Sequence, residues 1–123
     1  MDLQATVSAS CRELETTAAM MGVELKVHPA SVPALEQVVL ALREMQVDDS
    51  AIAGATFMLG AYLGEILRSV RGGNWCGGTD GDLLLKIGAT TYAPVAKVPK
   101  FAANPAGGDG LGFYASAVLA GEV

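Results

Sequence analysis

Glu65 is the side chain best placed to carry chemistry, because it is a carboxylate set late in a long apolar segment, residues 51–71. If buried, a carboxylate must be paired, hydrogen-bonded or shifted in pKa. Two interpretations stay open. Glu65 is either a buried acid that holds a cationic group of a ligand or caps a backbone, or the acceptor of a structural hydrogen bond from the backbone near Trp75 or from the Asn74 amide.

The other reactive side chains form no catalytic or metal-binding set. His28 is the single imidazole and precedes a proline, and neither Cys11 nor Cys76 lies near it in the sequence. These ligands are too few for zinc. Residues 80–82, Asp-Gly-Asp, lack the oxygen ligands of a calcium loop, and the glycines of residues 107–112 follow no predicted strand. We therefore predict no metal, no cofactor and no enzymatic activity.

Composition limits the class of protein. The chain has 123 residues, of which 51% are apolar and 17% charged, so residues 1–123 form a single domain with one core. The net charge of −5 argues against nucleic-acid binding. The uncharged run 51–64 is shorter than the roughly 20 residues that span a membrane. With no basic or long apolar start, we expect no signal peptide, free thiols and a cytoplasmic location.

Charge is unevenly distributed along the chain. Acidic side chains outnumber basic ones in residues 1–50, and basic ones outnumber acidic ones in residues 65–100. This asymmetry could orient an acidic partner. The alternative is two ordinary solvated surfaces of mixed charge.

The first predicted helix covers residues 3–21, where apolar side chains recur at steps of three and four. Cys11 lies on this apolar stripe and is expected in the core. Gln4 and Glu15 are assigned to the opposite, polar side of the helix. Gly22 follows the last periodic residue and predicts a left-handed cap.

Two further helices are predicted before the glycine-rich region. Residues 23–27 alternate apolar and charged side chains, which indicates either a short strand or an extended connector. A helix then begins with Ser31 as its N-cap and ends near Met45. Residues 51–71 form the central helix, which is apolar on nearly all sides and is therefore expected to be buried.

Gly60 and Gly64 lie one turn apart in this central helix. Each glycine costs about 1 kcal/mol relative to alanine inside a helix, which suggests a compensating close approach of another backbone. The two glycines leave a groove on the helix surface, and the backbone that enters it could belong to the same domain or to a second copy of the chain. Packing within the domain and a homodimer through this groove are therefore the two predictions.

The second half of the chain combines short strands and short helices. Residues 72–82 are rich in glycine and predict a loop or bulged strand. Residues 83–87 and 91–93 are expected to form an antiparallel hairpin. Residues 95–103 predict helical turns interrupted at Pro99, and residues 114–120 a terminal helix after a loop over residues 104–112. The predicted fold class is α+β, with a central buried helix, two amphipathic helices, a small antiparallel sheet and a short C-terminal helix.

The central helix carries the pattern Gly-x-Tyr-x-Gly-Glu and runs into a glycine and a tryptophan. In this respect residues 22–100 resemble a group of small bacterial domains of uncharacterised or immunity-type function. The resemblance implies a fold and no catalytic residues. The matching positions are Pro29, Ser31, Leu35, Gly60, Tyr62, Gly64, Glu65, Gly73, Trp75, Pro94, Lys97 and Val98.

Two functions are predicted. The first is a non-enzymatic interaction protein of accessory or immunity type, with a partner surface near the end of the central helix and residues 72–82. The alternative is a small-molecule-binding domain with a pocket between the central helix and the hairpin. The residues expected to bind ligand or partner are Glu65, Tyr62, Trp75 and Tyr92.

Overall fold

The fold combines helices with one small sheet in a computed structural model that describes residues 3–45, 49–77, 83–103 and 110–120. The α-helices are α1 (Leu3–Met20), α2 (Val32–Glu44), α3 (Asp49–Arg71), α4 (Pro94–Ala103) and α5 (Leu111–Leu119). A 3-10 turn, η1 (Pro29–Ser31), precedes α2. The strands are β1 (Asn74–Gly77), β2 (Leu83–Ile87) and β3 (Thr90–Tyr92). The predicted α+β class is confirmed.

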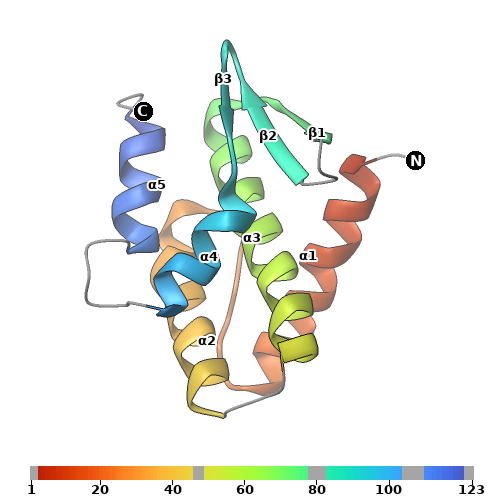
Figure 1. Cartoon of the computed structure of the whole chain (residues 1–123), viewed down its shortest axis with the longest axis vertical. Coiled ribbons are helices and arrows are strands. Elements are labelled where there is room, and N and C mark those ends of the chain that lie inside the picture. The colour runs from red at the N-terminus through yellow and green to blue at the C-terminus, as the bar shows by residue number, and fades with distance from the viewer. Residues whose placement is uncertain (1–2, 46–48, 78–82, 104–109, 121–123) are drawn as a thin grey trace.

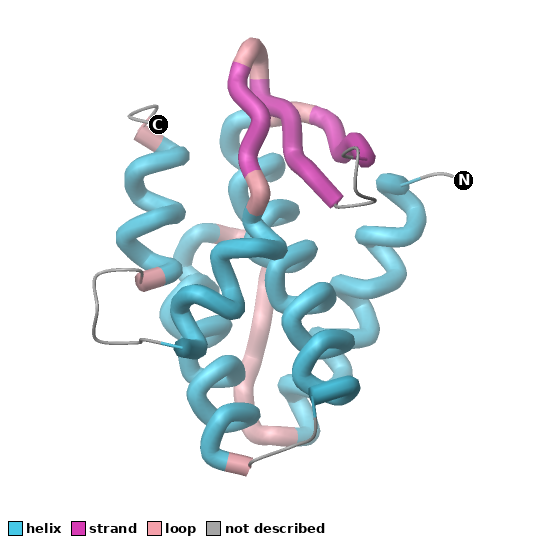
Figure 2. Tube along the Cα trace, viewed as in Figure 1, coloured by secondary structure: helices cyan, strands magenta, loops and turns pink. Residues whose placement is uncertain are grey.

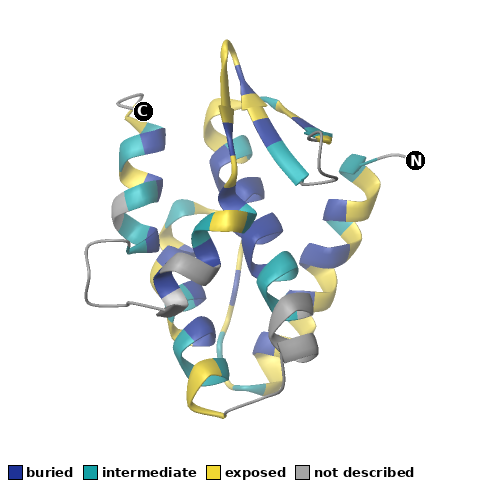
Figure 3. Cartoon of the chain, in the orientation of Figure 1, coloured by how far each residue is buried: buried dark blue, intermediate teal, exposed yellow. Residues whose placement is uncertain are grey.

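Helix α3 is the centre of the molecule, as its apolar sequence predicts. It packs against α1 on one side and against α2, α4 and α5 on the other sides (Figure 1). Tyr62, Leu63 and Ile66 are 0% exposed, and buried residues concentrate where the helices face one another (Figure 3). Among the described helices, none is long and apolar enough to cross a membrane.

The sheet is a three-stranded antiparallel ribbon at one end of the molecule (Figure 2). The predicted hairpin corresponds to β2 and β3. Part of the glycine-rich segment forms a third strand, β1. For this segment the sequence had left a loop and a bulged strand as alternatives. Gly73 allows the turn out of α3, because its φ is +109° and a Cβ there would lie 2.6 Å from the Lys86 carbonyl oxygen.

Before α2, the structure decides one open alternative and corrects one prediction. Residues 23–27 form no strand but an extended connector, the alternative that the alternation left open. Ser31 does not cap α2 with its side chain, because its Oγ instead accepts the backbone N–H of Lys26 at 2.9 Å. His28 is the residue that caps, with Nδ1 accepting the N–H of Ala30 at 3.0 Å at the start of η1.

Two predictions near the C-terminus also need correction. The interruption at Pro99 is wrong, since α4 is one continuous helix. Val98 and Phe101 are 1% and 2% exposed, so burial against the core outweighs the hydrogen bond that a proline removes. Helix α5 begins at Leu111 rather than at residue 114, because the buried Leu111 packs as part of it. The rest of the predicted 104–112 loop lies outside the described residues, except Gly110.

Candidate functional site

Glu65 lies where α1, α3 and β1 meet, and its carboxylate accepts hydrogen bonds from all three elements. Its Oε1 atom accepts from Trp75 Nε1 at 2.6 Å, from Arg68 Nε at 2.9 Å and from Gln4 Nε2 at 3.1 Å. Glu65 is only 8% exposed. A buried charge is tolerated when it is paired and hydrogen-bonded, and these partners meet that requirement.

The partners also set the ionisation state of Glu65. Burial by itself would raise the pKa of this carboxyl, but hydrogen bonds from Arg68, Trp75 and Gln4, together with the Arg68 charge, outweigh burial and lower the pKa. Glu65 is therefore ionised at neutral pH and engaged with three donors. A general base must be within hydrogen-bond reach of a substrate proton, whereas this carboxylate holds protein groups together.

A second polar contact crosses the same helix interface. The Tyr62 hydroxyl donates to Glu15 Oε2 at 2.7 Å. Burial, followed by the nearby charges of Glu65 and Glu15, raises the pKa of the Cys11 thiol to about 12. Because the thiolate is the nucleophilic form, Cys11 is inert, and its predicted place in the core is confirmed. Burial and the Glu15 hydrogen bond likewise raise the pKa of Tyr62.

Trp75 faces inward from β1 and lies over Gly64. A Cβ at Gly64 would come within 2.6 Å of the indole Cζ2 atom, so the missing side chain makes room for the ring. Trp75 is 8% exposed and shares the inner face of the sheet with Leu85 and Tyr92, which lie opposite one another in register. The indole therefore belongs to the core.

The four residues predicted to bind a ligand or partner are all buried. The exposed fractions are 0% for Tyr62, 8% for Glu65, 8% for Trp75 and 7% for Tyr92. The structure brings Glu65 and Trp75 into direct contact, turns Tyr62 toward α1, and places Tyr92 two strands away from Trp75. The indole occupies space between α3 and the sheet, where the predicted pocket was expected.

Gln4 and Glu15 take part in these hydrogen bonds, although the sequence assigned them to the wrong side of α1. Both point toward α3 and are half-buried, so their placement on the outer, polar side is corrected here. The spacing of these residues along α1 is the sequence feature that indicates their placement toward α3. Gln4 and Ser8 lie one turn apart, and Glu15 lies two turns beyond Ser8, so these three residues form a polar row beside the apolar stripe that includes Cys11.

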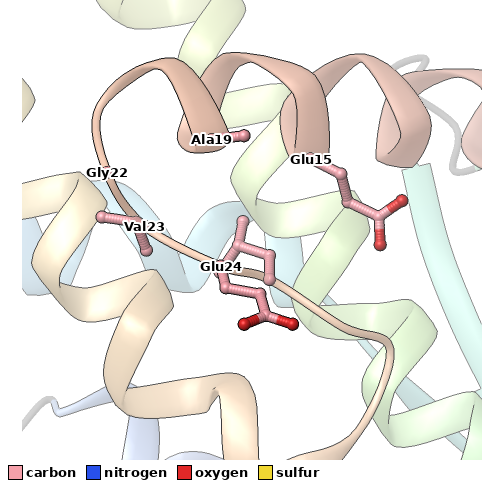
Figure 4. A pocket seen from close by; sticks show the side chains of 6 residues that line it. Glu15, Ala19, Gly22, Val23 and Glu24 are labelled. Carbon is pink, nitrogen blue, oxygen red and sulfur yellow. The ribbon is translucent and has the colours of Figure 1, made fainter.

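A shallow depression of about 280 Å³ lies between the end of α1 and the connector that follows (Figure 4). Its carboxylates are Glu15, which already accepts from Tyr62, and Glu24, whose side chain is 80% exposed and pairs with Lys26 at 3.4 Å. Within the described residues, no group of three or more His, Cys, Asp or Glu could hold a metal ion. Asp80 and Asp82 lie outside the described residues.

The outer face of the sheet is open. Asn74 pairs with Lys86, and Lys86 pairs with Thr91, so one row crosses all three strands, and all three residues are exposed. Val70 and Arg71 precede this row in the sequence, at the end of α3; both are exposed, and Val70 is 55% exposed although it is apolar. We group these five exposed residues, Val70, Arg71, Asn74, Lys86 and Thr91, under the name open face.

In comparisons with protein-family models, curated proteins and solved structures, nothing matches this chain. The resemblance to immunity-type domains therefore stays a prediction. The residues of the Gly-x-Tyr-x-Gly-Glu pattern nevertheless share a physical basis in this fold. Gly60 and Gly64 admit Val95 and Trp75 on one side of α3, while Tyr62 and Glu65 bind α1 on the other.

Proposed function

We propose that this protein is a non-enzymatic interaction protein, of accessory or immunity type, that binds an acidic partner protein through its open face. The observation that carries the proposal is the row of three exposed residues that crosses the sheet, together with the exposed Val70 that precedes it in the sequence. An antiparallel sheet with one buried and one solvated face can receive a partner on the solvated face without rearranging its core.

Charge supports an acidic partner. The chain carries a net charge of −5, yet among the residues that the structure describes the open face presents the cations Lys86 and Arg71 and no carboxylate. A local positive surface on an acidic protein attracts acidic surfaces and repels basic ones. This agrees with the basic excess of residues 65–100 and makes a basic partner unfavourable.

The small-molecule alternative has less support. Its predicted lining residues are buried, and Glu65 already accepts three hydrogen bonds from the protein. The homodimer through the glycine groove also loses its basis, because Gly60 and Gly64 face Val95 and Trp75 of the same chain. We propose a cytoplasmic location, in keeping with the two free cysteines among the described residues.

A short glutamate-rich peptide tests the proposal by titration into ¹⁵N-labelled protein. We expect amide shifts centred on Asn74, Lys86 and Thr91, and at least about fivefold weaker binding to Lys86→Glu. The matched control is Lys26→Glu, because the Lys26 side chain is 74% exposed and lies in the connector before η1. Equal weakening by both substitutions, or shifts centred elsewhere, would contradict the proposal.

A further inference from the structure

Helix α5 lacks the features that stabilise a helix from within. Its N-cap, Gly110, makes no side-chain hydrogen bond, its first turn has no acidic residue and its last turn has no basic residue. It is 9 residues long, and isolated helices shorter than about 12 residues are marginal in water. Helix α5 therefore depends on what it contacts.

Two other helices supply the missing caps. At the start of α5, Glu36 of α2 accepts the N–H of Gly112 through Oε1 at 2.9 Å. At its end, Arg71 of α3 donates from Nη1 to the carbonyl oxygen of Val118 at 2.9 Å. A carboxylate at the amino end and a guanidinium at the carboxyl end satisfy unpaired backbone groups and oppose the helix dipole.

The remaining contacts of α5 are a narrow apolar stripe and one cation–π contact. Leu111, Ala115 and Val118 are the buried residues, spaced at i, i+4 and i+7. Lys97 of α4 lies 5.5 Å from the centre of the Tyr114 ring. Charged groups of three neighbouring helices thus act on α5, and contacts of this kind weaken as salt rises.

Arg71 caps the C-terminal end of α5, yet it is also exposed and precedes the row of the open face in the sequence. From this we infer that α5 opens as a unit of its own, and that an acidic ligand on the open face loosens α5 by drawing Arg71 away from Val118. The inference about the ligand rests on the proposed function. The opening of α5 rests on the capping contacts alone.

Amide hydrogen exchange of the full chain tests both parts. We expect α5 amides to exchange through an opening that leaves α3 protected, and to exchange about fivefold faster when NaCl rises from about 0.05 M to about 1 M. In Arg71→Gln, exchange should already be fast at low salt and respond less to added salt. Arg12→Gln is the matched control, because Arg12 is exposed on α1.

Adding the glutamate-rich peptide at low salt should accelerate exchange in α5 of the wild type but not in Arg71→Gln, when the peptide concentration is raised until the amide shifts of Asn74, Lys86 and Thr91 show the same occupancy in both proteins. A peptide that binds the open face without changing α5 exchange overturns the coupling and leaves the proposed function standing. A peptide that does not bind overturns the proposed function and the coupling, whereas the salt series still decides the opening of α5. If the amides of α5 and α3 exchange at one common rate, the inference that α5 opens as a unit of its own is wrong.

Discussion

The two sides of α3 are built on opposite principles. Toward α4 and the sheet, glycines let Val95 and Trp75 approach the helix backbone closely. Toward α1, the contact includes polar groups, among them the Glu65 carboxylate and the Tyr62 hydroxyl. The side toward α4 is specified by the absence of side chains and the side toward α1 by hydrogen bonds, and Glu65 joins the two sides because it also accepts a hydrogen bond from Trp75.

The two interfaces therefore differ in which substitutions they tolerate. Close backbone packing fails when a single carbon is added, because the neighbouring backbone cannot move aside cheaply. A buried polar interface fails when a partner is removed, because the remaining group loses its hydrogen bond without regaining water. The same helix should therefore respond to enlargement on one side and to deletion on the other.

Enlarging Gly60 should have the greatest effect. A Cβ there would collide with the Cα of Val95, so Gly60→Leu should lower the free energy of unfolding by about 3 kcal/mol or more. Urea unfolding followed by circular dichroism measures the loss. Gly77→Ala is the control, since nothing lies within 4 Å of a Cβ at Gly77, and it should change stability by less than about 0.5 kcal/mol. A stable Gly60→Leu protein would contradict the close packing.

Removing the Glu65 side chain should have the next largest effect. Glu65→Ala leaves the Trp75 indole N–H buried without its acceptor and removes the partner of Arg68, so we expect a loss of about 2–3 kcal/mol. The Arg68 side chain is 34% exposed and regains some water, which limits the loss. Gln4→Ala removes a single donor and should cost about 1 kcal/mol. If both variants lost the same unfolding free energy, the Glu65 carboxylate would contribute no more than its single bond to Gln4.

The sequence allowed the helices to be predicted but not the contacts that connect them. The 3.6-residue period is a local property, and it located α1, α2 and α3 to within a few residues. The bond between Glu65 and Trp75 depends on the register of β1 against β2, which the glycine-rich segment does not encode by alternation. Gln4 was misassigned because a polar residue on a helix is ordinarily solvated, and only its partner on α3 reverses that expectation.

Acid should weaken the hydrogen bonds that Glu65 makes with α1, α3 and β1. The pKa of Glu65 in the folded protein lies below its ordinary value of 4.5, because the hydrogen bonds of Arg68, Trp75 and Gln4 outweigh burial. The stability that this carboxylate contributes is therefore complete above pH 4.5 and is lost as pH falls through the folded pKa. The difference in unfolding free energy between wild type and Glu65→Gln should stay constant above pH 4.5 and shrink as pH falls below it. A difference that stays constant below pH 4.5 as well would contradict the lowered pKa.

Tyr62→Phe should have the smallest effect, although Tyr62 is itself completely buried. Phenylalanine keeps the ring and removes only the hydroxyl that donates to Glu15. Glu15 lines the surface depression and can turn to water, so no buried charge is left unpaired, and we expect a loss of about 1 kcal/mol or less. Glu15→Gln keeps an acceptor for the hydroxyl and serves as the control in the same urea measurement. If Tyr62→Phe instead destabilised the protein as much as Glu65→Ala, the α1 interface would depend on both polar contacts equally, and Glu65 would not be its organising group.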